Sequence, residues 1–149
     1  MVNVEVKLSL EHCRGIFDLS ESPIETQFAW ALIGRMWREG VPVEVVSQTQ
    51  AATLPPRSIV LIPQYRWLGF RWDFALGAVG TCGRPLVLIE CDGQQFHTSP
   101  EQIENDRIKD RTAIDAGVKL LRFGGAAIFT DPHGCADDVM HTIVALARK

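Results

Sequence analysis

The chain has 149 residues, of which 46% are hydrophobic and 22% charged, and its formal net charge is −3. This length fits a single domain spanning residues 1–149, and the composition excludes an intrinsically disordered chain. No apolar run approaches the roughly 20 residues that a membrane-spanning helix needs, so we expect no membrane partner.

The four cysteines, Cys13, Cys82, Cys91 and Cys135, are scattered, and no two of them form a C-x-x-C pair. This spacing argues against a zinc or dithiol redox motif. The first ten residues alternate apolar with polar side chains, which indicates a strand over Met1–Leu10 and differs from the continuous apolar stretch of a signal peptide. We therefore expect reduced thiols and a cytoplasmic location.

The first helix is predicted after Ser22, which suits the N-cap, because Pro23 fits the first helical position and Glu25 lies three residues after the cap. It should run to Glu39, where Gly40 stops it. Such a helix packs one face against a sheet. The expected apolar face comprises Ile24, Phe28, Leu32 and Met36, widened by Trp30, Ile33 and Trp37.

Four strands are expected next, over Val43–Ser47, Ser58–Pro63, Phe70–Leu76 and Pro85–Asp92. The third alternates, with Phe70, Trp72, Phe74 and Leu76 expected on one face and Arg71, Asp73 and Ala75 on the other. The fourth is an almost continuous apolar run, which is typical of a central strand covered on both faces. The glycine-rich stretch 77–83 predicts a hairpin between these two strands.

A second helix is predicted from its cap at Ser99 to Gly117, followed by a buried strand over Val118–Phe123 and a last helix over Gly134–Ala147. The order is strand, helix, several strands, helix, strand, helix. It predicts an α/β protein whose central mixed sheet carries helices on both faces.

Three carboxylates stand on two of the predicted strands. Glu90 and Asp92 end the fourth strand, and the period of two turns both side chains to the same side. A hairpin between the third and fourth strands would place Asp73 beside Glu90. Buried carboxylates are costly unless a cation binds them, and converging carboxylates suit Mg²⁺, with Mn²⁺ as a substitute. The sequence therefore predicts a metal site of Asp73, Glu90, Asp92 and the backbone carbonyl of Cys91.

The charge around this cluster is basic although the whole chain is acidic. Residues 55–89 contain a single acid, Asp73, and four arginines, namely Arg57, Arg66, Arg71 and Arg84. A basic stretch can face a phosphate backbone, so Arg66 and Arg71 are candidates for contacting nucleic acid, together with Arg107 and Arg111 of the second helix. The alternative is that these arginines are solvated charges on strand ends and on an exposed helix face.

Several short motifs occur in a definite order along most of the chain. They are S-P-I-E at 22–25, R-W-D-F-A-L at 71–76, I-E-C-D-G-Q-Q-F-H at 89–97, N-D-R-I-K-D-R at 105–111, A-G at 116–117 and L-L-R-F at 120–123. Together they resemble the PD-(D/E)XK nuclease superfamily, and within it the branch similar to very-short-patch-repair endonucleases. The resemblance implies a restriction-endonuclease-like fold.

The resemblance also implies roles for individual residues. Asp73 and Glu90 match the metal-binding acids of the family, whereas Asp92 stands where many members have a lysine that orients or activates the attacking water. Glu25 matches a helix-borne acid that assists the metal or the water. The remaining matches lie downstream: His97 corresponds to a histidine of this branch that serves as base, acid or phosphate ligand, and Lys109 or Arg107 would supply the missing positive charge.

The function that the resemblance implies is metal-dependent hydrolysis of phosphodiester bonds by a DNA endonuclease in repair, recombination or defence. A magnesium ion on Asp73 and Glu90 would polarise the phosphate, and Asp92 or His97 would accept the proton of the water. The expected partner is duplex, mismatched or branched DNA, with a homodimer as an option. The alternative is a catalytically silent nuclease-like domain that binds nucleic acid or a partner protein.

Each candidate also has a simpler explanation. Glu25 occupies the position of a capping-box glutamate, and Asp92 followed by Gly93 is a common way to end a strand in a turn. His97 is equally compatible with a surface position. The charges between Asp106 and Arg111 are compatible with an ordinary solvated helix face.

Overall fold

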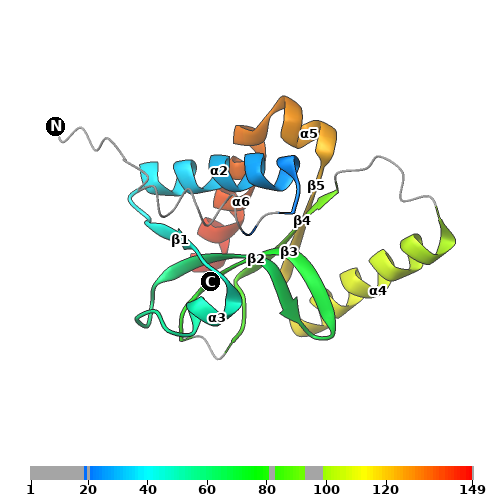
Figure 1. Ribbon diagram of the computed structural model, residues 1–149, viewed down its shortest axis with the longest axis horizontal. Helices are drawn as coiled ribbons and strands as arrows, with labels where there is room; N and C mark the ends of the chain where they lie inside the picture. Colours follow the sequence, from blue (N-terminus) through cyan, green and yellow to red (C-terminus); the bar gives the residue numbers. More distant parts are fainter. Residues whose placement is uncertain (1–18, 20, 81–82, 93–98, 149) are drawn as a thin grey trace.

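A computed structural model of the protein describes residue 19 and residues 21–80, 83–92 and 99–148. The strand predicted over Met1–Leu10 lies outside these residues. The elements follow in the order α2 (Pro23–Arg38), β1 (Val43–Val45), α3 (Gln48–Ala51), β2 (Ile59–Trp67), β3 (Phe70–Ala78), β4 (Val87–Asp92), α4 (Pro100–Ala116), β5 (Lys119–Gly124), α5 (Gly125–Thr130) and α6 (Pro132–Ala147) (Figure 1). The protein is α/β, as predicted.

The five strands form one mixed sheet in the order β1-β2-β3-β4-β5. The two edge strands, β1 and β5, pair in parallel with their neighbours, and the three inner strands pair antiparallel. Leu68 and Gly69 connect β2 to β3 with positive φ at both residues, 52° and 78°, which is the conformation of a tight two-residue hairpin turn. A parallel neighbour needs a long crossover, and α4 supplies it between β4 and β5.

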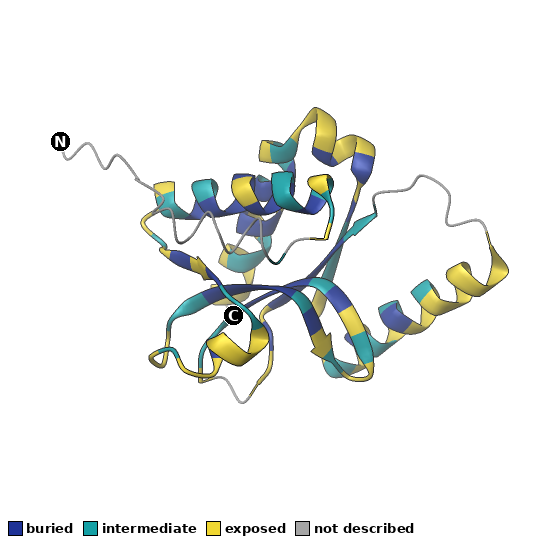
Figure 2. Cartoon of the chain, viewed as in Figure 1, coloured by how far each residue is buried: buried dark blue, intermediate teal, exposed yellow. Residues whose placement is uncertain are grey.

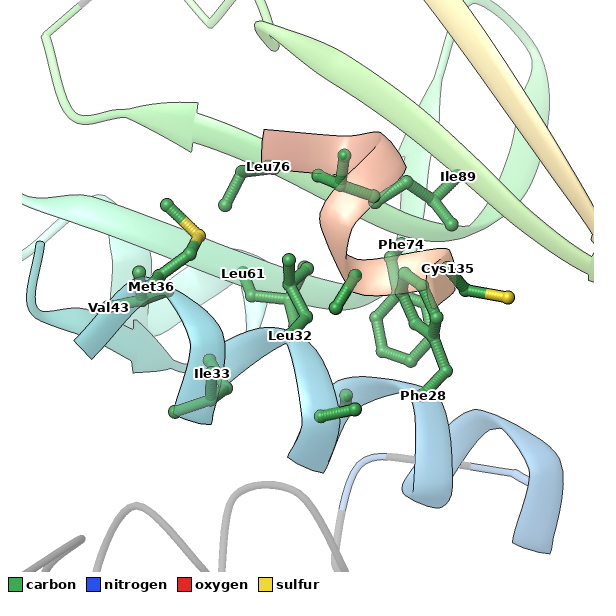
Figure 3. Packing of buried hydrophobic residues seen from close by; sticks show 14 of the residues in the cluster. Phe28, Leu32, Ile33, Met36, Val43, Leu61, Phe74, Leu76, Ile89 and Cys135 are labelled. Carbon is green, nitrogen blue, oxygen red and sulfur yellow. The ribbon is translucent and has the colours of Figure 1, made fainter. Parts of the chain in front are cut away.

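Helices cover both faces of this sheet, as predicted. On one face, Phe28, Leu32 and Met36 of α2 pack over Leu61 and Phe74, in a core that α5 and α6 complete (Figure 3). On the other face, a second cluster receives one alanine each from α3 and α4. That cluster comprises Ala51, Val60, Ile62, Tyr65, Trp72, Ala75, Leu88, Ala113 and Val118.

The two long helices before and after the central strands begin where their caps predict. The hydroxyl of Ser22 accepts a hydrogen bond from the amide of Glu25 at 3.2 Å, and that of Ser99 accepts one from Gln102 at 3.2 Å. Each cap satisfies an amide that has no partner within its helix. Helix α4 ends at Gly117, whose φ of 71° is the left-handed conformation that favours glycine.

Several predicted boundaries are wrong. Strand β2 continues past Pro63 to Trp67, and β1 ends at Val45 because Ser47 caps α3. The last helix begins at Pro132 rather than Gly134, after the cap Asp131. Helices α3 and α5, with 4 and 6 residues, were not predicted because so short a segment shows no helical periodicity.

Trp30 does not belong to the buried face of α2, since 44% of its surface is exposed. It lies two residues from both Phe28 and Leu32, and two helical residues span about 200° around the axis. Helix α4 is also largely exposed and extends away from the remaining elements (Figure 2). Within the described part of the chain, no helix combines the length and the apolar character needed to cross a bilayer.

The predicted alternation of β3 is wrong at Trp72 and at Phe70, which packs against the same cluster as Trp72. Phe74 packs in the core under α2, but Trp72 packs in the cluster on the opposite face. Strand β2 changes faces in the same way, because Leu61 joins the first cluster and Tyr65 the second. The change coincides with a break in the pairing of β2 and β3, which skips Gln64 and Asp73 between two regular stretches.

Candidate functional site

The described residues bury three charged side chains, and all three are predicted site residues. Glu25 and Glu90 each expose 6% of their surface and Lys109 exposes 9%. They come from α2, β4 and α4, which are distant in sequence. Burying a charge is unfavourable in free energy unless the charge is paired or binds a cation. The presence of all three charged side chains in one region therefore indicates a specific arrangement.

Asp73 and Glu90 meet where β3 and β4 separate. The last register pair of these strands is Phe74 with Ile89, so the next position along both strands is that of the two acids. One carboxylate oxygen of Asp73 accepts a hydrogen bond of 2.7 Å from the backbone N–H of Cys91. The structure thus brings Asp73 beside the end of β4, as the hairpin through 77–83 predicted.

The Glu90 carboxyl has an unusual proton affinity. Burial, followed by the charge of Asp73 and a hydrogen bond with it, raises the pKa of Glu90 from 4.5 to about 7, while Lys109 acts in the opposite direction. Two carboxylates at close range cannot both ionise without a cation. A positive charge beside these two carboxylates would therefore be stabilising.

Lys109 supplies one positive charge from α4. Its Nζ donates hydrogen bonds to Oε1 of Glu90 and, at 2.9 Å, to the backbone carbonyl of Arg71. It also lies 4.8 Å from the centroid of the Trp72 ring, within range of a cation–π interaction. Of the two cations that the sequence predicts for this position, Lys109 reaches Glu90, whereas Arg107 pairs with Glu104 on the exposed surface of α4 at 2.7 Å.

Glu25 approaches the same region from the first turn of α2. Its Oε2 accepts a hydrogen bond from the Ser22 hydroxyl at 2.9 Å, and its Oε1 accepts one from Nε2 of Gln64 at 2.6 Å. Burial raises the pKa of Glu25, and the charge of Asp73 adds to that effect. The contact with Gln64 on β2 and the electrostatic coupling to Asp73 link Glu25 to the sheet, beyond a capping role.

Asp92 belongs to a neighbouring charge cluster. Its Oδ1 lies 3.8 Å from a guanidinium nitrogen of Arg122, which stands beside Glu90 on β5. Arg122 also lies 3.8 Å from the carboxylate of Asp106 and pairs with that of Asp110 at 2.9 Å. Asp92 therefore shares a cation with two acids of α4.

The thiol of Cys91 has low reactivity in this environment. Burial and the surrounding carboxylates, Asp73 foremost, raise its pKa well above the ordinary value, so it stays protonated. A contribution of the Cys91 carbonyl to a metal site stays a prediction. His97 lies outside the described residues.

The predicted nucleic-acid contacts fall on two elements. Arg66 and Arg71 face each other across the β2–β3 hairpin, next to its turn, and both are exposed. Arg71 pairs with Glu21 at 3.0 Å. Arg107 and Arg111 lie on the exposed surface of α4. The hairpin adjoins the acids directly, because the carbonyl of Arg71 binds the Lys109 ammonium.

The donor chemistry of this region fits a magnesium ion held by few protein ligands. Across the residues that the structure describes, no group of three or more His, Cys, Asp and Glu side chains is arranged to hold a metal. Mg²⁺, however, is commonly bound by one or two carboxylates, with water and substrate phosphate completing its octahedron. Asp73 and Glu90 provide those two carboxylates, and their mutual repulsion favours a shared cation.

Two participants were not found from the sequence. The sequence predicts that the strand ends at Pro63, so Gln64 falls outside it, and its only signal is a polar residue following an apolar run. The sequence predicts Trp72 on the same face of its strand as Phe74, and the break in strand pairing at which it changes to the opposite face has no sequence signature. Comparison with protein-family models, with curated proteins and with solved structures finds no match for this chain.

Proposed function

We propose that this protein is a divalent-metal-dependent DNA endonuclease of the PD-(D/E)XK type, with a restriction-endonuclease-like fold similar to the very-short-patch-repair branch. The observation that supports this most is the meeting of two acids, Asp73 and Glu90, with Lys109 where β3 and β4 separate. Glu25 joins them through its electrostatic coupling to Asp73. Acids and a lysine at one strand end are the side chains that such hydrolysis needs.

In this proposal, Asp73 and Glu90 hold Mg²⁺ or Mn²⁺. The ion, when bound, withdraws charge from the scissile phosphate and makes a water molecule more acidic. Glu25, whose pKa is raised by burial, would receive the proton of the attacking water. Lys109 provides the positive charge that the resemblance locates at position 92, and it would stabilise charge developing on the phosphate.

DNA is the partner that the hairpin favours. Arg66 and Arg71 are exposed beside the acids, and arginine forms charge-assisted hydrogen bonds with phosphate oxygens. One site per chain would nick a duplex, so a double-strand break would require a homodimer. An intracellular role in repair, recombination or defence agrees with Cys91 and Cys135, which are free thiols.

The experiment is cleavage of supercoiled plasmid with Mg²⁺ or Mn²⁺, together with linear, single-stranded, mismatched and branched substrates. The wild type should cut only with metal, and Asp73→Ala and Glu90→Ala should each abolish cutting. Glu104→Ala is the matched control, because this carboxylate lies on exposed α4 and pairs with Arg107. Cutting that survives both site substitutions would refute the proposal.

A second candidate is a catalytically silent domain that binds nucleic acid. The observation favouring it is the direct ion pair between Lys109 and Glu90, which uses a carboxylate oxygen that a metal would need. This candidate predicts DNA binding that divalent ions do not enhance, and no cleavage of any substrate. Retained DNA binding by an inactive wild type would select it.

A further inference from the structure

Gln64 has a backbone conformation that its position in a strand does not explain. Its φ is 53°, in the left-handed region that glycine favours, although it lies within β2. The pairing of β2 with β3 is regular from Ile59 to Pro63 and again from Tyr65 to Trp67, so the interruption falls on Gln64 and on Asp73 opposite. Local irregularities of this kind re-aim a side chain and are common beside active sites.

The side chain of Gln64 contacts Glu25. Its Nε2 donates a hydrogen bond of 2.6 Å to Oε1 of Glu25, which is 39 positions away in the sequence. Its Oε1 is buried, and none of the residues that the structure describes donates a hydrogen bond to it. The amide group thus has one end fixed on Glu25 and the other end available as an acceptor inside the molecule.

Both features oppose folding. A left-handed conformation at a residue with a side chain is unfavourable, and so is a buried carbonyl oxygen without a donor. Such features persist where the surrounding structure enforces them, and they concentrate at functional sites. The break at Gln64 also coincides with the change of face in β3, where Trp72 and Phe74 belong to clusters on opposite sides of the sheet.

We propose that Gln64 is a positioning residue of this site, an inference that rests on the proposed nuclease function. Its N–H group fixes the carboxylate of Glu25, so that this carboxylate is held in the orientation in which it receives the proton of the attacking water. The water oxygen forms the new bond to phosphorus while the bond to the leaving oxygen breaks; one water proton passes to Glu25, and the leaving oxygen keeps the electron pair of the broken bond and takes a proton from bulk water. Gln64 takes up no proton.

A neutral amide suits this position for electrostatic reasons. It offers a donor and an acceptor at once, a combination that neither an ionised carboxylate nor a lysine provides. A further carboxylate would add negative charge beside Glu25 and Asp73, and burial has already raised the pKa of Glu25. A cation would compete for the oxygens that the proposed metal uses.

The test compares Gln64→Leu, which removes both hydrogen-bonding groups at similar volume, with Gln64→Asn, which keeps the amide on a shorter side chain. We expect kcat for plasmid cleavage to fall about tenfold to a hundredfold in Gln64→Leu with KM unchanged, and less in Gln64→Asn. The acidic limb of the pH–rate profile should move to higher pH, because Glu25 loses a donor. Gln27→Leu, at a half-buried glutamine of α2, is the control and should cleave normally.

A second readout needs no activity. Carbon NMR of the carboxyl groups in the metal-free protein should show the pKa of Glu25 rising in Gln64→Leu and staying unchanged in Gln27→Leu. An unchanged pKa of Glu25, or full kcat in Gln64→Leu, would overturn the role of Gln64 while leaving the nuclease proposal intact. A wild type that cuts nothing would refute the nuclease proposal instead, and the NMR titration would still decide whether Gln64 fixes Glu25.

Discussion

The ammonium of Lys109 is enclosed by a carboxylate, a backbone carbonyl and an aromatic ring. Glu90 and the carbonyl of Arg71 accept its hydrogen bonds, and Trp72 lies beneath it. Removing one partner of a buried ion pair lowers the free energy of unfolding by more than the intact pair contributes, because the other charge is left without compensation. Glu90 is the charge that would be stranded here.

Lys109→Met should therefore destabilise the protein in a pH-dependent way. The pKa of Glu90 is already raised to about 7, and without Lys109 it would rise further. Stability linked to a raised carboxyl pKa is present below the unfolded value of about 4.5 and is lost as pH rises through the folded pKa. We expect the loss of unfolding free energy to be about 1.4 kcal/mol larger at pH 8 than at pH 5, measured by urea unfolding, because one pKa unit separates the wild-type value from pH 8.

The matched control is Lys119→Met, at an exposed lysine that begins β5. It should change the free energy of unfolding by less than about 0.5 kcal/mol at either pH. Equal destabilisation of Lys109→Met at pH 5 and pH 8 would mean that packing of the lysine stem, and not its charge, explains the effect.

Individual residues of this site differ in how far the sequence predicts them. The proximity of Asp73 and Glu90 follows from the strand period and one hairpin, which are local rules. To predict that Lys109 and not Arg107 reaches the acids, one must know which side of α4 faces the sheet. Tertiary packing determines that orientation. To predict the contact of Gln64 with Glu25, one must know that Gln64 adopts a left-handed backbone conformation, which glutamine does not favour.

At the scale of elements, α4 is the most exposed of the long helices, and its charged side chains attach it to the sheet. Arg122 of β5 pairs with Asp110 at 2.9 Å, approaches Asp106, and donates to the Asp106 carbonyl at 3.5 Å. Lys109 provides a second attachment. Few apolar side chains of α4 are buried, so these polar contacts carry much of its docking.

Arg122→Met should therefore loosen α4 more than the other elements. Three acids, Asp92, Asp106 and Asp110, would lose their shared cation, and we expect a loss of about 1–3 kcal/mol. Hydrogen exchange should accelerate in 100–116 and much less in α2. Arg111→Met, at an exposed position of α4, is the control, and equal acceleration in both variants would contradict this role of Arg122.

The long elements were predictable because their end signals are local. Ser22 and Ser99 cap their helices with proline next in sequence, and Gly117 ends α4, all as expected. The short helices α3 and α5 depend on docking to the body of the protein, and four to six residues carry no periodic signal. The predicted end of β2 at Pro63 is wrong for a different reason, because proline rarely continues a strand.

At the scale of the whole molecule, the candidate site lies between two hydrophobic clusters on opposite faces of one sheet. Phe74 belongs to one cluster and Trp72 to the other, with Asp73 between them. Asp73 therefore lies where β3 passes from one cluster to the other, and a cation held by Asp73 and Glu90 would connect β3 to β4 at that point. Ligands that bind only the folded state stabilise the entire domain.

Divalent ions should raise the melting temperature of the metal-free protein if Asp73 and Glu90 hold them. A hundredfold excess of Mg²⁺ or Mn²⁺ over its dissociation constant would add about 2.7 kcal/mol, which is a shift of several degrees for a domain of this size. Asp73→Asn should lose the shift, and Glu104→Gln should keep it. Identical shifts in Asp73→Asn and the wild type would place the ion elsewhere.

The order of strands in the sheet repeats their order in the chain, so each strand pairs with its predecessor. Gln64, Asp73 and Glu90 all belong to the meander of β2, β3 and β4, whose contacts are close in sequence and therefore form fast. Lys109 comes from α4, which follows the meander in the chain. We therefore expect Asp73 and Glu90 to meet before Lys109 joins them during refolding, and pulsed hydrogen exchange should then show earlier protection in 59–92 than in 100–116.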